Sequence, residues 1–245
     1  MTRSIITSVN AGVATLTLSQ PEIRNAFSDV VIAEITAAFA EVGQRDDVRA
    51  VVLAAEGPAF CAGANLNWMR AMADYTREEN LADAGKLAAM LHTIATCPHP
   101  TIARVQGDVY AGGMGLVAAC DMAVAVQEAH FCLSEVKIGL IPATIAPYVL
   151  RAMGTRAGQR LGFVHQVVAA DDLDSAVDGL LKHLLSAGPA AVRACKRLVD
   201  DVAGCEINAA LVARTVECIA DIRASAEGKE GVQAFLNKRK PNWLG

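Results

Sequence analysis

The chain has few aromatic residues, no excess of positive charge and no long apolar run. Aromatic residues make up 4% of its 245 residues, so the core must be built mainly from aliphatic side chains. Asp and Glu (26) outnumber Lys and Arg (22), for a net charge of −4, whereas nucleic-acid-binding domains are usually basic. No segment approaches the ~18 apolar residues of a membrane span, and Met1–Ser4 lead into a strand-like segment instead of a secretion signal. We therefore expect a cytoplasmic protein that binds neither nucleic acid nor a membrane.

The cysteines and histidines lack the spacings of a disulfide framework or a metal site. The cysteine count is odd, at 7, and no two cysteines are spaced as in a CxxC motif. None of the 5 histidines stands in an HExxH or HxxxH arrangement. We expect free, mostly buried thiols in a reducing compartment, no metal ion and no resident cofactor. The cysteines are Cys61, Cys97, Cys120, Cys132, Cys195, Cys205 and Cys218.

The composition is that of a folded chain, and its first third alternates between strand and helix patterns. Hydrophobic residues make up 53% and charged residues 20%, which is typical of globular proteins. Residues 15–18 alternate polar and apolar side chains, as in a half-buried strand. Residues 48–54 are almost all apolar, which is typical of a strand covered on both faces. Between them, Ser28 can cap a helix. Its apolar positions would be Val31, Ile32, Ile35, Ala38, Phe39 and Val42.

The alternation continues to about residue 126 and then gives way to helices. We expect a long helix over about 66–96, a strand over 101–105, a helix that ends near Cys120, and a buried strand over 122–126. This order predicts an α/β fold. From residue 171 the patterns are helical, with stripes over 173–185, 207–222 and 232–236 and a helix start at Gly188-Pro189. We therefore divide the chain into residues 1–170, which would hold the active site, and a helical region over 171–245.

Two glycine-rich segments offer free backbone N–H groups. Phe60-Cys61-Ala62-Gly63-Ala64-Asn65-Leu66 follows a buried strand, and small residues there allow a ligand to approach the backbone. Residues 107–115 read Gly-Asp-Val-Tyr-Ala-Gly-Gly-Met-Gly, and Gly112-Gly113 opens a helix whose first N–H groups could hold a developing negative charge. The spacing fits neither a P-loop nor GxGxxG. Each segment alone is equally compatible with a tight turn or with close helix packing.

A third segment, residues 133–140, places Glu135 between apolar residues in a strand-like stretch. Such a carboxyl can be solvated or paired with a cation, here Lys137. It can also be buried with a raised pKa and act as a general base. Both interpretations stay open on the residues alone.

The three segments occur together in an order that resembles a known family. Ala-Gly-Ala-Asn-Leu at 62–66, Gly-Gly-Met-Gly at 112–115 with Cys120-Asp121 downstream, and Ser-Glu-Val-Lys-Ile-Gly-Leu at 134–140 resemble the crotonase family of enoyl-CoA hydratases and isomerases. The resemblance covers nearly the whole chain, including Ser19-Gln20-Pro21, Arg24-Asn25-Ala26 and the helical tail. It implies a spiral of ββα units with a C-terminal helical trimerisation region. It also implies a homo-oligomer, either a trimer or a dimer of trimers.

The resemblance also implies a substrate and a role for each motif residue. The substrate would be an acyl-CoA thioester, so that coenzyme A is part of the substrate and no separate cofactor is needed. The N–H groups of Ala64 and Gly112 would hold the enolate oxygen, and Glu135 would be the general acid and base. Residues at positions that bind coenzyme A or the acyl chain in the family are Arg24, Ala26, Ala62, Asn65, Leu66, Gly115, Phe235 and Lys238. The last two positions often reach the coenzyme A of a neighbouring subunit.

The sequence departs from the family at two places. Hydratases with two glutamates carry the first one where this chain has Gly115. Either Glu135 alone would then activate water and return a proton to Cα, or another group would help. Family members also carry about one more helix-turn unit where Gly154–Arg160 passes directly to Leu161. Either this unit is deleted at Arg156-Ala157 or the sequence omits residues there. We favour omission, because this segment flanks the acyl pocket in the family and could be mobile. A deletion there would weaken the assignment of the substrate.

Longer segments resemble a subgroup with acidic substrates. Residues 62–70, 133–149 and 225–236 look like bacterial hydratases of 3-methylglutaconyl-CoA, in leucine breakdown, or of isohexenylglutaconyl-CoA, in acyclic terpene breakdown. Both substrates carry a distal carboxylate. We expect Gly115 to remove a like charge and to open room for that carboxylate, with Lys137 or Arg151 as candidates to pair with it.

Other functions compete with this interpretation. An enoyl-CoA isomerase would use Glu135 without adding water, and a general short-chain enoyl-CoA hydratase, a thioesterase or a decarboxylase would fit the same scaffold. A mammalian relative of the subgroup binds RNA through a lysine-rich helix, but residues 70–96 here mix Arg70, Arg77 and Lys86 with four acidic residues. A non-catalytic protein that binds coenzyme A would have no need of Glu135.

Overall fold

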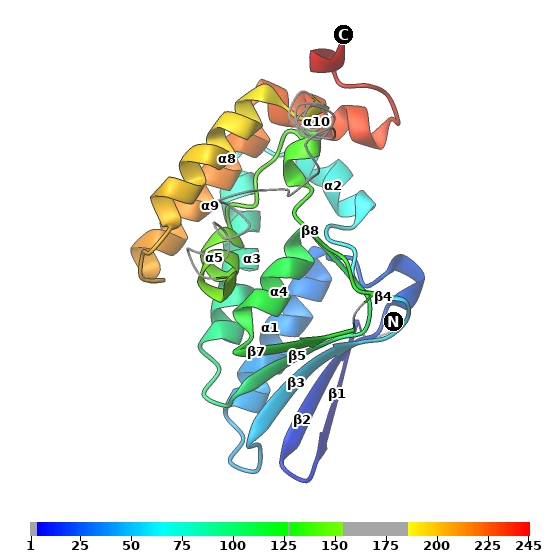
Figure 1. The fold of residues 1–245 in the computed structure, drawn as a ribbon, viewed down its shortest axis with the longest axis vertical. Coiled ribbons are helices and arrows are strands. Elements are labelled where there is room, and N and C mark those ends of the chain that lie inside the picture. The colour runs from blue at the N-terminus through cyan, green and yellow to red at the C-terminus, as the bar shows by residue number, and fades with distance from the viewer. Residues whose placement is uncertain (1–3, 127, 154–185) are drawn as a thin grey trace, which may run out of the picture.

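The computed structural model describes residues 4–126, 128–153 and 186–245, and within them the chain winds through repeated ββα units (Figure 1). The first strand of each unit enters a five-stranded sheet of order β1-β2-β3-β5-β7. The second strand of each later unit enters a three-stranded sheet of order β4-β6-β8. The α/β class and the spiral of ββα units are confirmed. The strands are β1 Ile5–Asn10, β2 Val13–Leu18, β3 Ala50–Ala55, β4 Ala59–Cys61, β5 Thr101–Val105, β6 Asp108–Tyr110, β7 Met122–Ala125 and β8 Phe131–Cys132.

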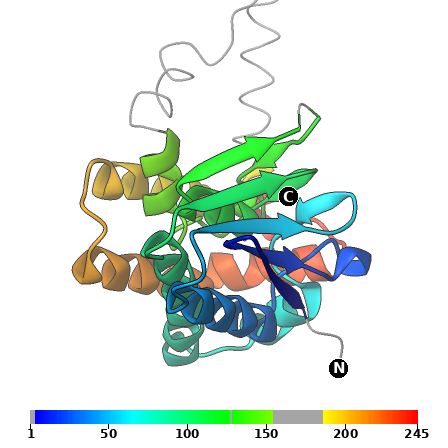
Figure 2. The ribbon, with the colours of Figure 1, turned by 90° about the horizontal axis from the view of Figure 1, so that it is seen from below.

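Helices cover one face of the five-stranded sheet (Figures 1 and 2), and the core residues of the sheet are aliphatic. Apart from the antiparallel β1–β2 hairpin, its neighbouring strands are parallel. Leu16 is paired with Leu53, and Leu53 with Ala103, and all three side chains are fully buried. The strands expected over 15–18, 48–54 and 101–105 are therefore confirmed, with β2 and β3 shifted by one or two residues at their ends.

Helix α1 (Asp29–Gly43) has the cap and the buried face that its sequence predicts. The Ser28 Oγ accepts a hydrogen bond from Val31 N at 3.3 Å, which satisfies one of the free N–H groups of the first turn. The six apolar positions expected to face the core are the six that are buried. The 3.6-residue spacing thus sufficed to orient this helix.

The long helix expected over 66–96 is wrong, because it is two helices, α2 (Leu66–Ala73) and α3 (Arg77–Ala95). Thr76 and Glu79 form a capping box in which each side chain accepts a hydrogen bond from the other residue's backbone N–H. This reciprocal cap favours a new helix start. The Thr-x-x-Glu spacing is visible in the sequence and could have located the break.

Two further expectations of local structure are wrong. Strand β7 is exposed rather than buried, with Val124 66% exposed, because it is an edge strand of the five-stranded sheet. Glu135 lies in a short 3-10 helix, η2 (Glu135–Ile138), and not in a strand. Gly139, in the left-handed conformation at φ 75°, ends this helix.

The C-terminal helices α8 (Pro189–Val202), α9 (Ala209–Ala224) and α10 (Ala226–Leu236) confirm the helical character of this region from Pro189 onward. Helix α9 packs along α3, and α10 contacts α2 and η2. Helix α5 (Ala146–Met153) packs against both α4 (Gly112–Ala119) and α8. The stripe over 173–185 and the boundary between residues 170 and 171 lie outside the described residues, so the domain division stays a prediction. The remaining short helices are η1 (Pro21–Ile23) and η4 (Asn242–Leu244).

The full sequence corrects the expectation of omitted residues at Arg156-Ala157. It runs without a gap through all 245 positions, so the chain is shorter there than the resemblance implies. Residues 154–185 themselves lie outside the described part of the structure. Among the residues that are described, no helix is both long enough and apolar enough to cross a membrane.

Glycines let α10 approach the backbone that carries Glu135. A Cβ at Gly231 would lie 2.2 Å from the Ile138 carbonyl oxygen, well inside van der Waals contact. A Cβ at Gly228 would lie 2.1 Å from the Ile222 carbonyl oxygen, at the turn between α9 and α10. The position of η2 therefore depends on the absence of a side chain at Gly231 of α10.

We predict that Gly231→Ala lowers the free energy of unfolding by roughly 1–3 kcal/mol, because backbone has to move to admit the methyl group. The matched control is Gly85→Ala in α3, where an added Cβ has no heavy atom within 4 Å. This second change should stabilise by about 0.5–1 kcal/mol through helix propensity. Urea titrations of both variants measure the difference. Equal effects at the two sites would contradict the packing argument.

Candidate active site

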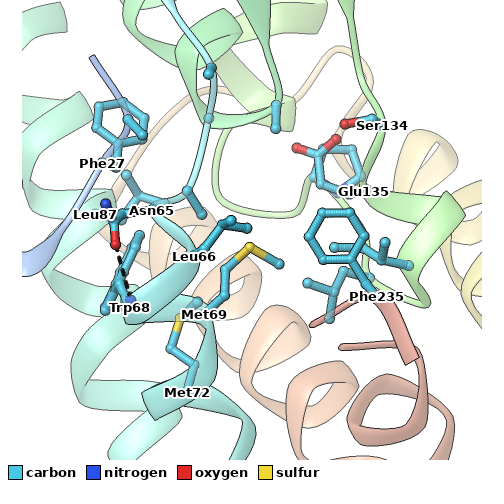
Figure 3. A pocket seen from close by; sticks show the side chains of 18 of the residues that line it. Phe27, Asn65, Leu66, Trp68, Met69, Met72, Leu87, Ser134, Glu135 and Phe235 are labelled. Carbon is cyan, nitrogen blue, oxygen red and sulfur yellow. Dashed lines mark hydrogen bonds between the residues drawn. The ribbon is translucent and has the colours of Figure 1, made fainter. Parts of the chain in front are cut away.

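A cavity of about 890 Å³ brings together the three sequence motifs (Figure 3). Residues 62–66 reach it from the end of β4 and the start of α2, Gly112 from the start of α4, and Glu135 from η2. The parallel strands β4, β6 and β8 lie side by side and lead into these segments. Segments far apart in the sequence therefore end at one place. The expected site residues that line the cavity are Arg24, Ala26, Ala62, Ala64, Asn65, Leu66, Gly112, Glu135 and Phe235.

The turn around Ala64 leaves its N–H free. Phe27 N donates to the Gly63 carbonyl and Asn65 N donates to the Phe27 carbonyl, both at 2.7 Å. These two bonds fix the peptides on either side of Ala64. The Ala64 N–H itself has no acceptor among the described residues. Asn65 then caps α2, because its Oδ1 accepts from Asn67 N at 2.9 Å.

The turn before α4 leaves a second N–H free. Gly112 is the first residue of α4, so its N–H has no partner within the helix, and none elsewhere in the described chain. The positive end of the helix dipole adds to its attraction for negative charge. Ala111, before it, has φ 47° and ψ −121°, a strained conformation for a residue with a Cβ. The Ala111 N–H donates to the Cys132 carbonyl at 2.9 Å and so anchors the turn beside β8.

These two turns touch each other through glycines. A Cβ at Gly63 would lie 3.0 Å from the Ala111 Cβ, and one at Gly112 would lie 2.7 Å from the Phe27 ring. A Cβ at Gly113 would lie 2.8 Å from the Cys61 Cβ. The glycines thus bring two backbone segments with free N–H groups to one end of the cavity, where a carbonyl oxygen that gains negative charge could accept from both.

Glu135 has the properties of a general base. Its Oε2 is buried and has no hydrogen-bond partner among the described residues. Burial raises the pKa of the carboxyl from its ordinary value of 4.5 to about 7, although hydrogen bonds from the backbone of Glu135 and Ser134 oppose the shift. Lys137 also lines the cavity but forms no ion pair with Glu135 within the described structure. Of the two open interpretations, the geometry favours the buried carboxyl.

The rest of the cavity wall is largely apolar and was not identified from the sequence. In Figure 3, Phe235 and Glu135 point into the cavity, and Leu66 and Met69 of α2 point toward them. Met72 and Leu87 lie further along the wall. The two methionines follow the helical spacing of a buried face, which is the same signal that a simple core would give. Further wall residues are Phe27, Trp68, Ile138, Leu140, Ile141, Ile145 and Ile219.

Gly115 does not open room in the cavity, and this expectation is wrong. Gly115 is buried in α4 and does not line the cavity. A Cβ there would lie 2.5 Å from Ile145 Cγ2 and 3.2 Å from Leu91 Cδ2. The space that a longer side chain would use is filled by Ile145, which itself forms part of the cavity wall.

The three cations expected to contact the substrate lie at different places in the structure. Lys137 lines the cavity. Arg151 does not, and its guanidinium lies 5.8 Å from the centre of the Tyr148 ring on another face. Lys238 is exposed just after α10 and does not line the cavity of its own chain, so its expected contact with a neighbouring subunit's coenzyme A stays a prediction.

Sequence analysis missed Arg223, a buried cation on the cavity wall. Its Nη1 donates to Asp83 Oδ2 at 3.0 Å, and Asp83 Oδ1 accepts from Trp68 Nε1 at 3.1 Å. The sequence did contain a signal for this position. The buried α9 residues Leu211, Thr215 and Ile219 are spaced four residues apart, and Arg223 comes next at the same interval, on the same face of the helix. A charge at such a position is expected to have a partner.

No group of His, Cys, Asp and Glu side chains in the described residues could hold a metal ion. All seven cysteines are free thiols. Burial raises the pKa of Cys61 and of Cys120 to about 12, so neither is a ready nucleophile.

Comparisons with known proteins agree with this geometry. A family model described as enoyl-CoA hydratase/isomerase matches residues 8–161 and 153–245. The enoyl-CoA hydratase AKT6-1 of Alternaria alternata is 30% identical over 250 residues, which cover 94% of this chain and 80% of the relative.

Solved structures give the same result at higher identity. An enoyl-CoA hydratase from Shewanella pealeana is 39% identical with a TM-score of 0.63, covering 98% of this chain and 96% of that one. A Legionella pneumophila protein described as an enoyl-CoA hydratase/isomerase (crotonase) is 40% identical with a TM-score of 0.63, covering 98% of both chains. The chain therefore has the α/β crotonase fold, belongs to the enoyl-CoA hydratase/isomerase family and is by homology an enzyme of the enoyl-CoA hydratase class.

Proposed function

We propose that this protein hydrates a branched glutaconyl-CoA, either 3-methylglutaconyl-CoA or isohexenylglutaconyl-CoA, with Glu135 as the only general acid and base. The observation that carries the proposal is the buried Glu135 Oε2, which has no hydrogen-bond partner among the described residues, in one cavity with the free N–H groups of Ala64 and Gly112. A base and two donors for an oxyanion are what addition of water to an α,β-unsaturated thioester requires.

The reaction needs one proton to be taken and one to be returned. Glu135 removes a proton from water as the oxygen adds to Cβ, and the electrons of the double bond move to the thioester oxygen. The N–H groups of Ala64 and Gly112 hold that oxygen, and each such donor is worth roughly 10²–10³ in rate in other oxyanion holes. Protonated Glu135 then gives its proton to Cα. A pKa of about 7 suits both steps near neutral pH.

The acidic substrate class is supported by the sequence of three segments and by the charge of the cavity. Residues 62–70, 133–149 and 225–236 carry the resemblance to hydratases of branched glutaconyl-CoA. Four cations line the cavity, namely Arg24, Arg70, Lys137 and Arg223, against Glu22 and Glu135. This excess of positive charge favours an anionic ligand, with the phosphates of coenzyme A at the exposed side of the cavity and a carboxylate deeper inside it.

We also propose that the enzyme works in the cytoplasm as a homo-oligomer. Phe235, 47% exposed at the end of α10, lines the cavity of its own chain, and Lys238 follows it on the surface. In a trimer or a dimer of trimers, Lys238 would contact the coenzyme A of a neighbour. The helical region 171–245 would form the interface between subunits.

An isomerase is the second candidate, because the same geometry suits it. Glu135 could carry a proton from Cγ to Cα without adding water, and the same two N–H groups would hold the dienolate oxygen. Labelled water separates the two reactions. A hydratase incorporates one ¹⁸O atom into the product at Cβ, and an isomerase incorporates none.

We predict that 3-methylglutaconyl-CoA is hydrated with a higher kcat/KM than crotonyl-CoA, because only the former has a carboxylate to pair with the cavity cations. Glu135→Gln should lower kcat on both by about 10²–10⁴. Isohexenylglutaconyl-CoA belongs in the same assay, since the chain is short at Arg156-Ala157, beside the acyl pocket by resemblance. Faster turnover of crotonyl-CoA than of either acid would contradict the substrate class.

The pH dependence of the reaction is expected to follow the raised pKa of Glu135. The active form is the carboxylate, so kcat/KM should rise with pH and reach a plateau above a midpoint near pH 7. Glu78→Gln, a change at an exposed carboxyl in the first turn of α3, is the control and should leave the midpoint in place. A midpoint near pH 4.5 would show that burial does not act on Glu135 as described.

Stability should change with pH in the opposite sense. Between pH 4.5 and about pH 7 the folded protein holds a proton that the unfolded chain has released, so the free energy of unfolding falls across this window. Glu135→Gln removes this loss and should stabilise the protein relative to wild type at pH 8, by up to ~3 kcal/mol, and not at pH 4.5. Thermal midpoints at the two pH values measure the effect.

We predict that Gly115→Glu damages packing rather than substrate choice. The new side chain meets Ile145 and Leu91, so stability should fall by roughly 1–3 kcal/mol or more, and kcat/KM should fall alike for acidic and neutral substrates. Adding Ile145→Ala should recover part of the stability, because it frees the space next to residue 115. A loss confined to the acidic substrate, with stability intact, would restore the role first expected of Gly115.

A further inference from the structure

Arg223, on the wall of the cavity, forms a buried ion pair with Asp83 of α3. Their side chains are 11% and 7% exposed. Apolar residues that line the same cavity include Met72, Leu87 and Ile219. Apolar residues of similar volume would line a pocket for a neutral acyl chain equally well, and buried ion pairs are poor stabilisers of a fold. The pair therefore calls for a functional explanation.

In this ion pair, both Asp83 oxygens accept a hydrogen bond, whereas one donor of Arg223 has no partner among the described residues. Asp83 accepts one bond at each oxygen, from Arg223 Nη1 and from Trp68 Nε1. Arg223 Nε is buried and has no partner among the described residues. An unpaired buried donor costs about 1–3 kcal/mol, and this cost is removed when an acceptor arrives. Since both Asp83 oxygens already accept a hydrogen bond, a group that enters the cavity can serve as this acceptor.

The shape of the free donors selects the acceptor. Nε–H and Nη2–H form one edge of the guanidinium, and this edge matches the two oxygens of a carboxylate. The other cations of the cavity differ, because Arg24, Arg70 and Lys137 are exposed. Exposed cations can reach the phosphates of coenzyme A in solvent. Arg223, buried between α3 and α9, is placed for a group carried by the acyl chain.

We propose that Arg223 is the specificity-determining residue that binds a carboxylate at the end of the acyl chain, with Asp83 and Trp68 as positioning residues. This inference rests on the proposed function, in that it explains why an acidic acyl-CoA is chosen. It does not depend on hydration, because a saturated acyl-CoA with the same carboxylate would bind in the same way.

The test compares the binding of glutaryl-CoA and pentanoyl-CoA, two saturated ligands that differ by a carboxylate in place of a terminal methyl group. Isothermal titration of the full-length protein should give a preference for glutaryl-CoA of about 10- to 100-fold, as expected for a charged hydrogen-bonded pair. The double variant Asp83→Asn/Arg223→Gln removes both charges together, so neither is left unpaired. It should bind the two ligands within about twofold of each other, with the affinity for pentanoyl-CoA unchanged.

Two further variants make the outcome specific. Arg70→Gln changes an exposed cation of the same cavity and should weaken both ligands by the same factor. Arg223→Lys keeps the charge next to Asp83 without the planar fork, and should lose most of the preference even if the double variant fails to fold. Equal binding of both ligands by the wild type, or a preference that survives in the Arg223 variants, would overturn the inference.

The hydration assay distinguishes failure of this inference from failure of the proposed function. An Arg223-dependent preference for glutaryl-CoA without hydration of any glutaconyl-CoA would overturn the proposed function and leave the carboxylate site standing. Hydration of 3-methylglutaconyl-CoA that is unaffected by Arg223→Lys would overturn the carboxylate site and leave the proposed function standing.

Discussion

The active site depends on the close approach of two backbone turns at the carboxyl ends of parallel strands. The turns at Gly63 and Gly112 can touch because neither glycine carries a Cβ, and their neighbours Phe27 and Cys61 fill the remaining space. Hydrogen bonds fix the peptides beside Ala64 and before Gly112, and the N–H groups of Ala64 and Gly112 have no acceptor in the described part of the chain. In the proposed function these N–H groups form an oxyanion hole, and such a hole needs little reorganisation when charge develops, because its donors are already oriented.

Burial gives the two charged groups of the cavity their properties. Glu135 is held by η2, which is in turn fixed by the glycine face of α10, and the low polarity around its carboxyl raises its pKa toward neutrality. Arg223 is buried as well, but Asp83 compensates its charge. One cavity thus holds a buried carboxyl with a pKa near 7, which we propose transfers protons, and a buried, charge-paired arginine, which we propose binds the substrate.

Local sequence patterns correctly predicted those elements whose conformation depends mainly on residues within the same segment. The apolar positions of α1 and the Ser28 cap lie within one segment, so the spacing alone gave the buried face. The same reasoning failed for residues 66–96, where the capping box at Thr76 outweighed continuous helix propensity. It also failed for β7, because an apolar strand at a sheet edge has the same sequence as one in the middle.

The sequence by itself determined the family, through the order of its three motifs, and with it the α/β fold and the candidates Ala64, Gly112 and Glu135. Only the tertiary structure showed that the Glu135 Oε2 is buried with no partner among the described residues, that Ile145 fills the space beside Gly115, and that Arg223 lines the cavity. The physical reason is that motifs are local, whereas desolvation, free volume and charge pairing are set by neighbours on other elements. Arg223 and Asp83 are 140 residues apart in the chain, and only the packing of α9 on α3 brings them together.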